Sequence, residues 1–407
     1  MNLNRLIIAC TLLTTLQFFS CAVGQKNANT KSEKSIFPTF SWDTMPLYMH
    51  FHKRHKLTEE EVNYLAKFPL ITLEKSTGYK TYEGTEEGST EAAKAIKAIN
   101  PNTKILYYKN CVINWANYVE DELFLKEHPD AYLTTSEGDF AVMPNKSKTK
   151  FFDISKDYVQ AYWLDHVTKY ANNPYLDGIF IDASVKIFAP VFFKHRKVGQ
   201  KKRDALKMGY YEMLGELRNR LAQKKIIISN ILRIRPEKDF DNGNALLRYN
   251  DGSYIEGFEH EAHGLSYAEF LAKGIANVQR AARAGNIIAM SLGIGEAVDH
   301  HTAGIDDVRK DIILDEKFND RLDYLLAIFL VCAEKYSYVY PHDGYDVNNV
   351  RGSSASKVWL KTFPQYDKPL GPPKGPAKQE GYIYTRSFEQ VDVWLDIENQ
   401  KARLDWK

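Results

Sequence analysis

The sequence predicts an α/β fold, a (β/α)8 barrel of the TIM type followed by a short β-hairpin segment. Two observations carry this prediction: the number of strand-like apolar segments and the helical patterns that alternate with them. An open, doubly wound sheet is the alternative, but it would need glycines after the first strand, where residues 49–54 are bulky and charged. The expected strands are residues 46–51, 70–74, 104–108, 178–182, 225–229, 253–258, 286–291 and 337–340.

Each expected helix follows from a local pattern. Acidic residues open the segment 58–67, which suits the positive N-terminal end of a helix dipole. The alanine-rich segment 89–99 ends before an Asn-Pro pair, which stops a helix. Apolar side chains recur with a helical period in residues 155–171 and 202–224. The remaining helices are expected at residues 266–284 and 320–333.

The composition changes after the eighth expected strand. Residues 363–380 are rich in proline and glycine and have the character of a linker. Alternating apolar and polar residues over 382–388 and 391–397 predict a β-hairpin, and a third strand is expected at 403–406. We therefore expect a barrel spanning residues 37–362 and a C-terminal segment, residues 363–407, that packs on it.

The N-terminus has the features of an export signal. Arg5 precedes an apolar run over residues 6–19, which is short for a bilayer span. Cys21 follows that run, at the position where a bacterial lipoprotein is cleaved and acylated. We expect a signal peptide over residues 1–21, a flexible tether over 22–36, and an exported protein that is periplasmic or anchored to the outer membrane. Ordinary export with loss of Cys21 is the alternative.

The composition excludes several classes of partner. The net charge of +2 gives no reason to expect nucleic acid or an anionic membrane surface. Hydrophobic residues at 44% and charged residues at 26% are ordinary for a globular protein. The chain has 25 tyrosines, and this aromatic content favours a carbohydrate partner, because sugar rings stack on aromatic faces. Contact with a membrane is expected only through a lipid on Cys21.

Two carboxylates stand at the ends of apolar strands. Asp182 closes the segment 175–182, and Glu256 lies in the sixth expected strand. The carboxyl ends of barrel strands build the active site, and partial burial there can raise a carboxyl pKa. Glycoside hydrolysis uses such a pair, with one carboxyl as acid and the other as nucleophile or base. The alternative is that each carboxylate forms an ion pair with a neighbouring lysine or arginine.

Other polar side chains are expected at the same ends of the strands. Their expected role is to bind sugar hydroxyls, and that of the tryptophan among them is to stack on a sugar ring. The expected substrate-binding residues are His50, His52, Glu74, Lys109, Asn110, Trp115, Asn230, Glu259, His342 and Asp343.

Two histidines raise the alternative of a metal-dependent hydrolase. His50 and His52 point the same way along a strand, and Asp343 could join them as a metal ligand. The fifth strand ends without a histidine, however, and the sixth carries Glu256 where such a site needs a histidine. We therefore expect neither a metal nor another cofactor.

Three segments together resemble hypothetical glycosyl hydrolase family 15: residues 175–182 (YLDGIFID), 254–258 (YIEGF) and 384–388 (YTRSF). This family comprises barrel proteins placed near glycoside hydrolases and is similar to the α-galactosidase-like superfamily. In that superfamily the nucleophile follows the fourth strand and the acid/base follows the sixth. The resemblance thus implies that Asp182 is the nucleophile and Glu256 the acid/base. Those relatives generally carry aspartate on the sixth strand, so Glu256 departs from their pattern.

The leading hypothesis is an exported glycoside hydrolase that acts on a poly- or oligosaccharide. A surface glycan-binding lipoprotein that has kept a barrel without catalysis is the second hypothesis, because the export signal and aromatic content suit it equally.

Overall fold

The computed structural model describes residues 36–144, 148–236, 240–256, 258–259, 263–294, 316–341, 347 and 359–407. The predicted signal peptide with Cys21, most of the predicted tether, and the candidate residues His342 and Asp343 lie outside the described residues. Among the described residues, none of the helices is both long enough and apolar enough to cross a membrane.

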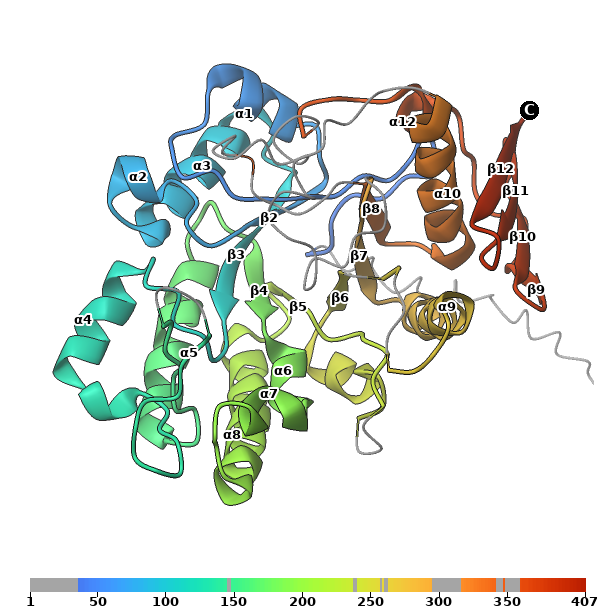
Figure 1. Cartoon of the computed structure of the whole chain (residues 1–407). Coiled ribbons are helices and arrows are strands. Elements are labelled where there is room, and N and C mark those ends of the chain that lie inside the picture. The colour runs from blue at the N-terminus through green and yellow to red at the C-terminus, as the bar shows by residue number, and fades with distance from the viewer. Residues whose placement is uncertain are drawn as a thin grey trace, which may run out of the picture. The chain divides into compact units, whose positions relative to one another are not determined.

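Eight parallel strands form one sheet in sequential order, which curls into a nearly closed barrel (Figure 1). The two edges meet at a parallel bridge between Leu47 and Val339, where Tyr48 N donates to Val339 O over 2.9 Å. The predicted fold class and all eight predicted strands are confirmed. The strands are β1 (Met49–Phe51), β2 (Leu70–Leu73), β3 (Lys104–Asn110), β4 (Gly178–Asp182), β5 (Ile226–Ser229), β6 (Gly252–Ile255), β7 (Ile287–Leu292) and β8 (Ser337–Pro341).

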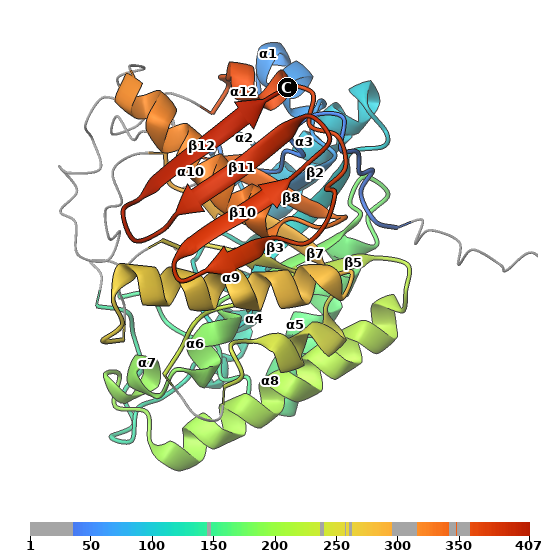
Figure 2. The same ribbon diagram turned by 90° about the vertical axis from the view of Figure 1, so that its right-hand side faces the viewer.

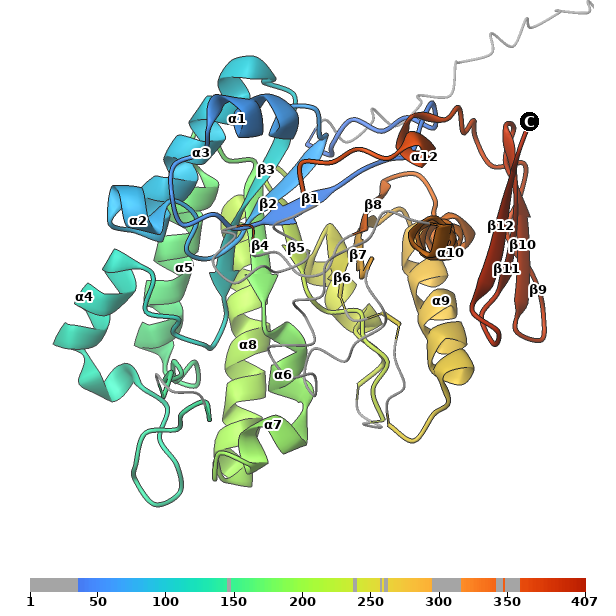
Figure 3. The same cartoon turned by 45° about the horizontal axis from the view of Figure 1, so that its top comes forward.

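Helices follow the strands and surround the sheet (Figures 1 and 3). Two begin at capping boxes, in which a hydroxyl and a glutamate exchange hydrogen bonds with the backbone: Thr58 with Glu61, and Ser266 with Glu269. The helices are α1 (Glu59–Leu65), α2 (Tyr79–Tyr82), α3 (Thr85–Ile99), α4 (Val119–Glu127), α5 (Asp157–Ala171), α6 (Ser184–Phe188), α7 (Pro190–Lys194), α8 (Gln200–Leu221), α9 (Tyr267–Arg283), α10 (Glu316–Cys332) and α12 (Pro364–Asp367), with 3-10 turns η1 (Pro129–Ala131) and η2 (Asn244–Tyr249).

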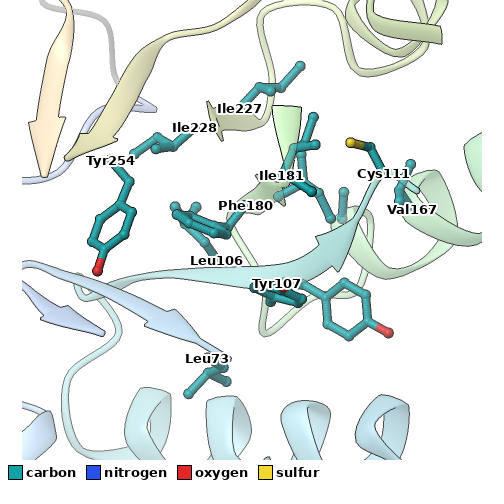
Figure 4. Close-up of a cluster of buried hydrophobic side chains, with 14 of the residues drawn as sticks. Leu73, Leu106, Tyr107, Cys111, Val167, Phe180, Ile181, Ile227, Ile228 and Tyr254 are labelled. Atoms are coloured by element: carbon teal, nitrogen blue, oxygen red, sulfur yellow. The ribbon is translucent and has the colours of Figure 1, made fainter. Parts of the chain in front are cut away.

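Aromatic rings occupy the interior of the barrel. Phe180 of β4 lies at its centre. The centroid of its ring is 5.0 Å from that of His50, 5.4 Å from that of Tyr254 and 5.6 Å from that of Tyr108. The neighbours of Phe180 on the strand, Ile179 and Ile181, are fully buried and, by the alternation of a strand, face the surrounding helices. Figure 4 shows part of this buried cluster. The floor beneath the carboxyl ends of the strands is therefore apolar and aromatic.

A four-stranded antiparallel sheet follows the barrel, in the order β12-β11-β10-β9 (Figure 2). The predicted hairpin and third strand are confirmed, and the sheet has one more strand than expected. Val391, Val393 and Leu395 point from this sheet into a cluster that includes apolar side chains of α10. Arg386 is buried there and donates to Leu330 O over 2.9 Å near the end of α10. The strands are β9 (Lys378–Glu380), β10 (Ile383–Ser387), β11 (Val391–Asp396) and β12 (Lys401–Trp406).

Candidate active site

Asp182 is the last residue of β4 and stands partly buried at the carboxyl end of the barrel. The chain turns sharply after it, because Ala183 adopts a left-handed conformation with φ of 65° before α6 begins. A side chain with a Cβ atom adopts such a conformation at a cost, and strain of this kind is concentrated at functional sites. The turn holds the Asp182 carboxylate at the mouth of the barrel.

Three donors from the neighbouring strands surround the Asp182 carboxylate. Tyr108 Oη donates to Oδ2 over 2.7 Å, and Asn110 Nδ2 lies 3.3 Å from the same oxygen. Both come from the inward face of β3, whose residue Asn110 pairs in register with Asp182. Asn230, which directly follows β5, donates from Nδ2 to Oδ1 over 3.4 Å. Every one of these contacts favours the charged form of the carboxyl group.

The pKa of Asp182 is lower than that of an ordinary aspartate. Burial on its own would raise this pKa, but the positive charges of Lys186 and Lys75 and the hydrogen bond from Tyr108 lower it by more. Burial, which can raise a carboxyl pKa, is therefore outweighed at Asp182 by these positive charges and hydrogen bonds. A carboxylate held in its ionised form is suited to act as a nucleophile or to stabilise a cation, and not to donate a proton.

Glu256, the second predicted carboxylate, contacts the same neighbour as Asp182, the amide of Asn230. Asn230 Nδ2 donates to Glu256 Oε2 over 3.1 Å while also contacting Asp182 Oδ1 at 3.4 Å. Since both contacts are made by one nitrogen atom, Asp182 Oδ1 and Glu256 Oε2 are no more than about 6.5 Å apart. Arg233 also binds Glu256 Oε2, at 3.0 Å, and the Glu256 side chain is 48% exposed.

Glu74 forms a second buried acidic group at this end of the barrel. It follows β2 and contacts His50 Nε2 at 2.9 Å and Lys75 Nζ at 2.8 Å. Burial tends to raise the pKa of Glu74, but Lys75 and then His50 lower it overall. Lys75 also lowers the pKa of Asp182, so one ammonium group serves both carboxylates. His50 is 1% exposed, and its other ring nitrogen lies 3.0 Å from Tyr48 Oη.

Trp115 and Asn110 make further contacts near this group. Trp115 is partly buried, and Lys75 Nζ lies 5.1 Å from the centre of its ring. Asn110 also accepts from Val112 N and Ile113 N through Oδ1, which fixes its amide orientation. His52 is 6% exposed at the end of β1.

Two predicted residues do not join the group, which corrects the sequence analysis. Lys109 points out of the barrel into the helix layer, where its Nζ contacts both oxygens of Asp121 at 2.6 and 2.7 Å. The reason is that β3 continues to residue 110, so strand alternation turns Lys109 outward. Glu259 is buried against Arg321 on α10, with both of its oxygens 2.8 Å from the guanidinium.

Sequence reasoning missed three residues of the site: Tyr108, Lys75 and Arg233. The alternation of Tyr108 with Asn110 would have indicated that the tyrosine faces inward, had β3 been extended by two residues. Lys75 directly follows Glu74, at the same strand end. The role of Arg233 depends on a contact across two strands, which the sequence does not reveal.

With this geometry in view, comparisons with known proteins identify the family. The model of hypothetical glycosyl hydrolase family 15 matches residues 97–392, close to three quarters of the chain. The chain belongs to hypothetical glycosyl hydrolase family 15. The predicted resemblance is thus confirmed, and the protein is placed among glycoside hydrolase-like TIM barrels. A search of curated proteins found no match.

Solved structures similar to this member of hypothetical glycosyl hydrolase family 15 include sugar-cleaving barrels. An α-amylase from Geobacillus thermoleovorans, solved with acarbose, has a TM-score of 0.48 and 12% identity, with 88% of this chain and 87% of that chain covered. A maltogenic α-amylase from Thermotoga neapolitana has a TM-score of 0.47 and 12% identity, with 86% of each chain covered. A GH36 α-galactosidase from Geobacillus stearothermophilus has a TM-score of 0.46 and 10% identity, with 88% of this chain but only 48% of that chain covered.

The match to hypothetical glycosyl hydrolase family 15 covers only part of the site. Residues 97–392 include Asp182, Asn230 and Glu256, together with β3 and its inward residue Tyr108. His50, Glu74 and Lys75 come from β1 and β2, before the matched region begins.

Proposed function

We propose that this protein is an exported glycoside hydrolase that cleaves a glycosidic bond in a poly- or oligosaccharide. Asp182 is the nucleophile or cation stabiliser, and Glu256 is the general acid/base. The observation that carries the proposal is the amide of Asn230, which contacts an ionised Asp182 on one side and Glu256 on the other. Export rests on the N-terminal sequence, with Cys21 as a lipid attachment site and the periplasm or outer membrane as the destination.

In the first step, Glu256 gives its proton to the glycosidic oxygen and the bond from this oxygen to the anomeric carbon breaks. Asp182 forms a bond to that carbon, or stabilises its positive charge, through the electron pair of one carboxylate oxygen. In the second step, water adds to the anomeric carbon, Glu256 takes its proton back and Asp182 leaves. Retaining enzymes hold the two carboxyl groups about 5–5.5 Å apart and inverting enzymes about 6.5–9.5 Å apart, so the anomeric configuration of the first product decides between the two routes.

Substrate hydroxyls have suitable partners beside the two carboxylates. Asn230 is 5% exposed, and its Oδ1 has no hydrogen-bond partner among the described residues. Its Nδ2 must face the carboxylates, because only the amide nitrogen can donate to them, so Asn230 orients both carboxylates toward the substrate. The ring of Trp115 is a stacking surface for the sugar. No metal ion or cofactor enters this proposal.

The test begins with a panel of polysaccharides and a reducing-sugar assay on the purified protein. Asp182→Asn and Glu256→Gln should each lower kcat/KM by about 10²–10⁴-fold on the glycan that the wild type cleaves. The matched control is Asp177→Asn, just before β4 at the opposite end, where Asp177 pairs with Lys97 over 2.7 Å. Per folded molecule, the control should keep the wild-type rate. Full activity in both site variants would refute the assignment.

External azide separates the roles of the two carboxylates. In Asp182→Gly, azide takes the place of the nucleophile and the glycosyl azide has the opposite anomeric configuration to the substrate. In Glu256→Ala, azide attacks the glycosyl-enzyme and the configuration is retained. The reverse pattern would exchange the two assignments.

One observation favours a second candidate function, a glycan-binding barrel without catalysis. Arg233 and Asn230 both contact Glu256 Oε2, at 3.0 and 3.1 Å, so two donors already occupy an oxygen through which Glu256 would act on a glycosidic bond. A binding protein would hold a glycan with the same affinity in wild type and Glu256→Gln and release no product from it. Product formation that Asp182→Asn abolishes would exclude this candidate.

A further inference from the structure

Three side chains meet in the helix layer, on the outer side of β3. They are Glu86 in the first turn of α3, Glu120 in the first turn of α4 and His166 of α5. One oxygen of each carboxylate and one ring nitrogen of His166 lie within 4.8 Å of one another. Glu86 is 6% exposed and His166 is 2% exposed, whereas the Glu120 side chain is 30% exposed.

The Glu86 carboxylate has one satisfied oxygen and one unsatisfied oxygen. Oε1 accepts a hydrogen bond from Glu120 N over 2.9 Å. Oε2 is fully buried and has no hydrogen-bond partner among the residues that the structure describes, and the helices and strand around it are all described. Burying a carboxylate oxygen without a hydrogen-bond donor costs folding free energy. We therefore expect a cation, a proton or a water molecule beside Glu86 Oε2.

His166 directs its Nδ1 atom to the same place. Its Nε2 contacts Tyr107 Oη at 3.0 Å, and Nδ1 lies 3.1 Å from Glu120 Oε2. A metal ion on Nδ1 would require the ring proton on Nε2, directed at Tyr107 Oη. Metal-bound histidines are usually held by such a partner on the other ring nitrogen.

We propose that Glu86, Glu120 and His166 bind a divalent transition-metal ion of the zinc class. Two carboxylates and an imidazole are ligands that Zn²⁺ accepts, and water can complete its four-coordinate shell. Bonds to Zn²⁺ are about 2.0–2.2 Å long, so ligand atoms that lie as much as 4.8 Å apart must move closer together when the ion binds. The partly exposed Glu120 side chain can make that movement.

The environment favours this class of ion over a hard cation. An imidazole ligand suits zinc, whereas calcium and magnesium prefer all-oxygen shells. Lys169 and Tyr170 both contact Glu120 Oε1 at 2.6 Å, which leaves Oε2 directed at His166. The ion would tie α3, α4 and α5 together on the side of β3 opposite Asp182. The site therefore goes beyond the proposed hydrolysis and holds irrespective of it.

Zinc titration of the metal-stripped protein, followed by calorimetry, tests the proposal. The wild type should bind one Zn²⁺ and gain thermal stability in proportion to occupancy. Glu86→Gln and His166→Gln should weaken binding by at least about tenfold, because loss of an outer-shell partner alone costs that much. Co²⁺ should give visible absorption bands in the wild type that both variants lose.

Two control variants make the result specific. His128→Gln removes an exposed histidine at the end of α4 and should leave Zn²⁺ affinity unchanged. Lys169→Met removes a competing positive charge and should raise the affinity by up to about fivefold. A dissociation constant above about 100 μM in the wild type, or equal affinity in wild type and Glu86→Gln, would overturn the proposal. Should His166→Gln fail to fold, the nearly isosteric Glu86→Gln still decides between these results.

Discussion

The hydroxyl of Tyr108 donates a 2.7 Å hydrogen bond to Oδ2 of Asp182, from a ring that stacks on Phe180 at the centre of the barrel. The tyrosine thereby links the rigid aromatic floor to the reactive carboxylate. It orients Asp182 and helps to keep it ionised, which are the two properties that a nucleophile requires.

Replacing Tyr108 with phenylalanine should reduce kcat/KM by about 10–100-fold, because a hydrogen bond to a charged group is lost. The bond lowers the pKa of Asp182, so its removal raises that pKa and moves the acidic limb of the pH–activity profile to higher pH. Steady-state kinetics from pH 3 to pH 9 would measure both effects. Tyr158→Phe removes a similar hydrogen bond, 2.6 Å long, to the exposed Asp130. This control should change neither kcat/KM nor the acidic limb of the pH–activity profile. An unchanged acidic limb in Tyr108→Phe would contradict the role given to the tyrosine.

Replacing Lys186 with glutamine tests the electrostatic effect on Asp182 separately. Lys186 lowers the pKa of Asp182 by its charge and makes no hydrogen bond to that carboxylate among the described contacts. Its loss should shift the acidic limb to higher pH while kcat on the plateau changes little. Increasing salt should shrink the difference between variant and wild type, because screening weakens charge interactions. Lys194→Gln, on α7, is the matched control.

Replacing Lys75 with methionine should destabilise the fold, because the buried Glu74 loses its 2.8 Å ion pair. A loss of about 2–3 kcal/mol in the free energy of unfolding is expected at pH 7. The folded pKa of Glu74 is lowered, so this contribution is present above the unfolded value of about 4.3 and is lost as the pH falls below it. Urea unfolding at pH 7 and pH 3 should show a smaller difference between the two proteins at pH 3 than at pH 7, because the loss proceeds as the pH falls through the folded pKa. Equal differences at both pH values would indicate lost packing in place of lost charge.

Replacing Gly178 with alanine should cost about 3 kcal/mol or more in folding free energy. A Cβ atom at this first residue of β4 would lie 2.0 Å from Ile226 O on the neighbouring strand, and backbone atoms cannot move aside cheaply. Thermal and urea unfolding would measure the loss. Gly375→Ala is the control, because a Cβ atom there meets nothing within 4 Å. A variant as stable as the wild type would show that β4 and β5 are less tightly paired than described.

The sequence predicted the strands well and the short helices poorly. Runs of apolar residues such as those of β4 and β7 are buried on both faces and can be recognised locally. The helices α2, α4, α6 and α7 lie in insertions and have between four and nine residues. Helices this short gain little stability from their own sequence and form through tertiary contacts, which a local pattern does not contain.

Site prediction depended on where each strand was expected to end. Asp182 was placed correctly because its strand ends on it. Lys109 was misplaced because β3 was expected to end at residue 108, whereas it runs to Asn110 and turns the lysine outward. Lys75 acts on Asp182, and Arg321 binds Glu259, although the two residues of each pair belong to separate elements. Glu259 and Arg321 are 62 residues apart in the sequence. Such pairs follow from the three-dimensional fold and have no local signal.

The position of Arg386 in the C-terminal sheet has a consequence for how the protein unfolds. This buried side chain binds Leu330 O at 2.9 Å and Glu334 at 3.0 Å, and so joins β10 to the last turn of α10. The sheet also covers apolar side chains of α10 that would otherwise meet water. Residues 36–407 form one compact unit, so barrel and sheet should melt in a single cooperative transition. Removing the last 45 residues would therefore expose the apolar side chains of α10 that the sheet covers, and this exposure would promote aggregation.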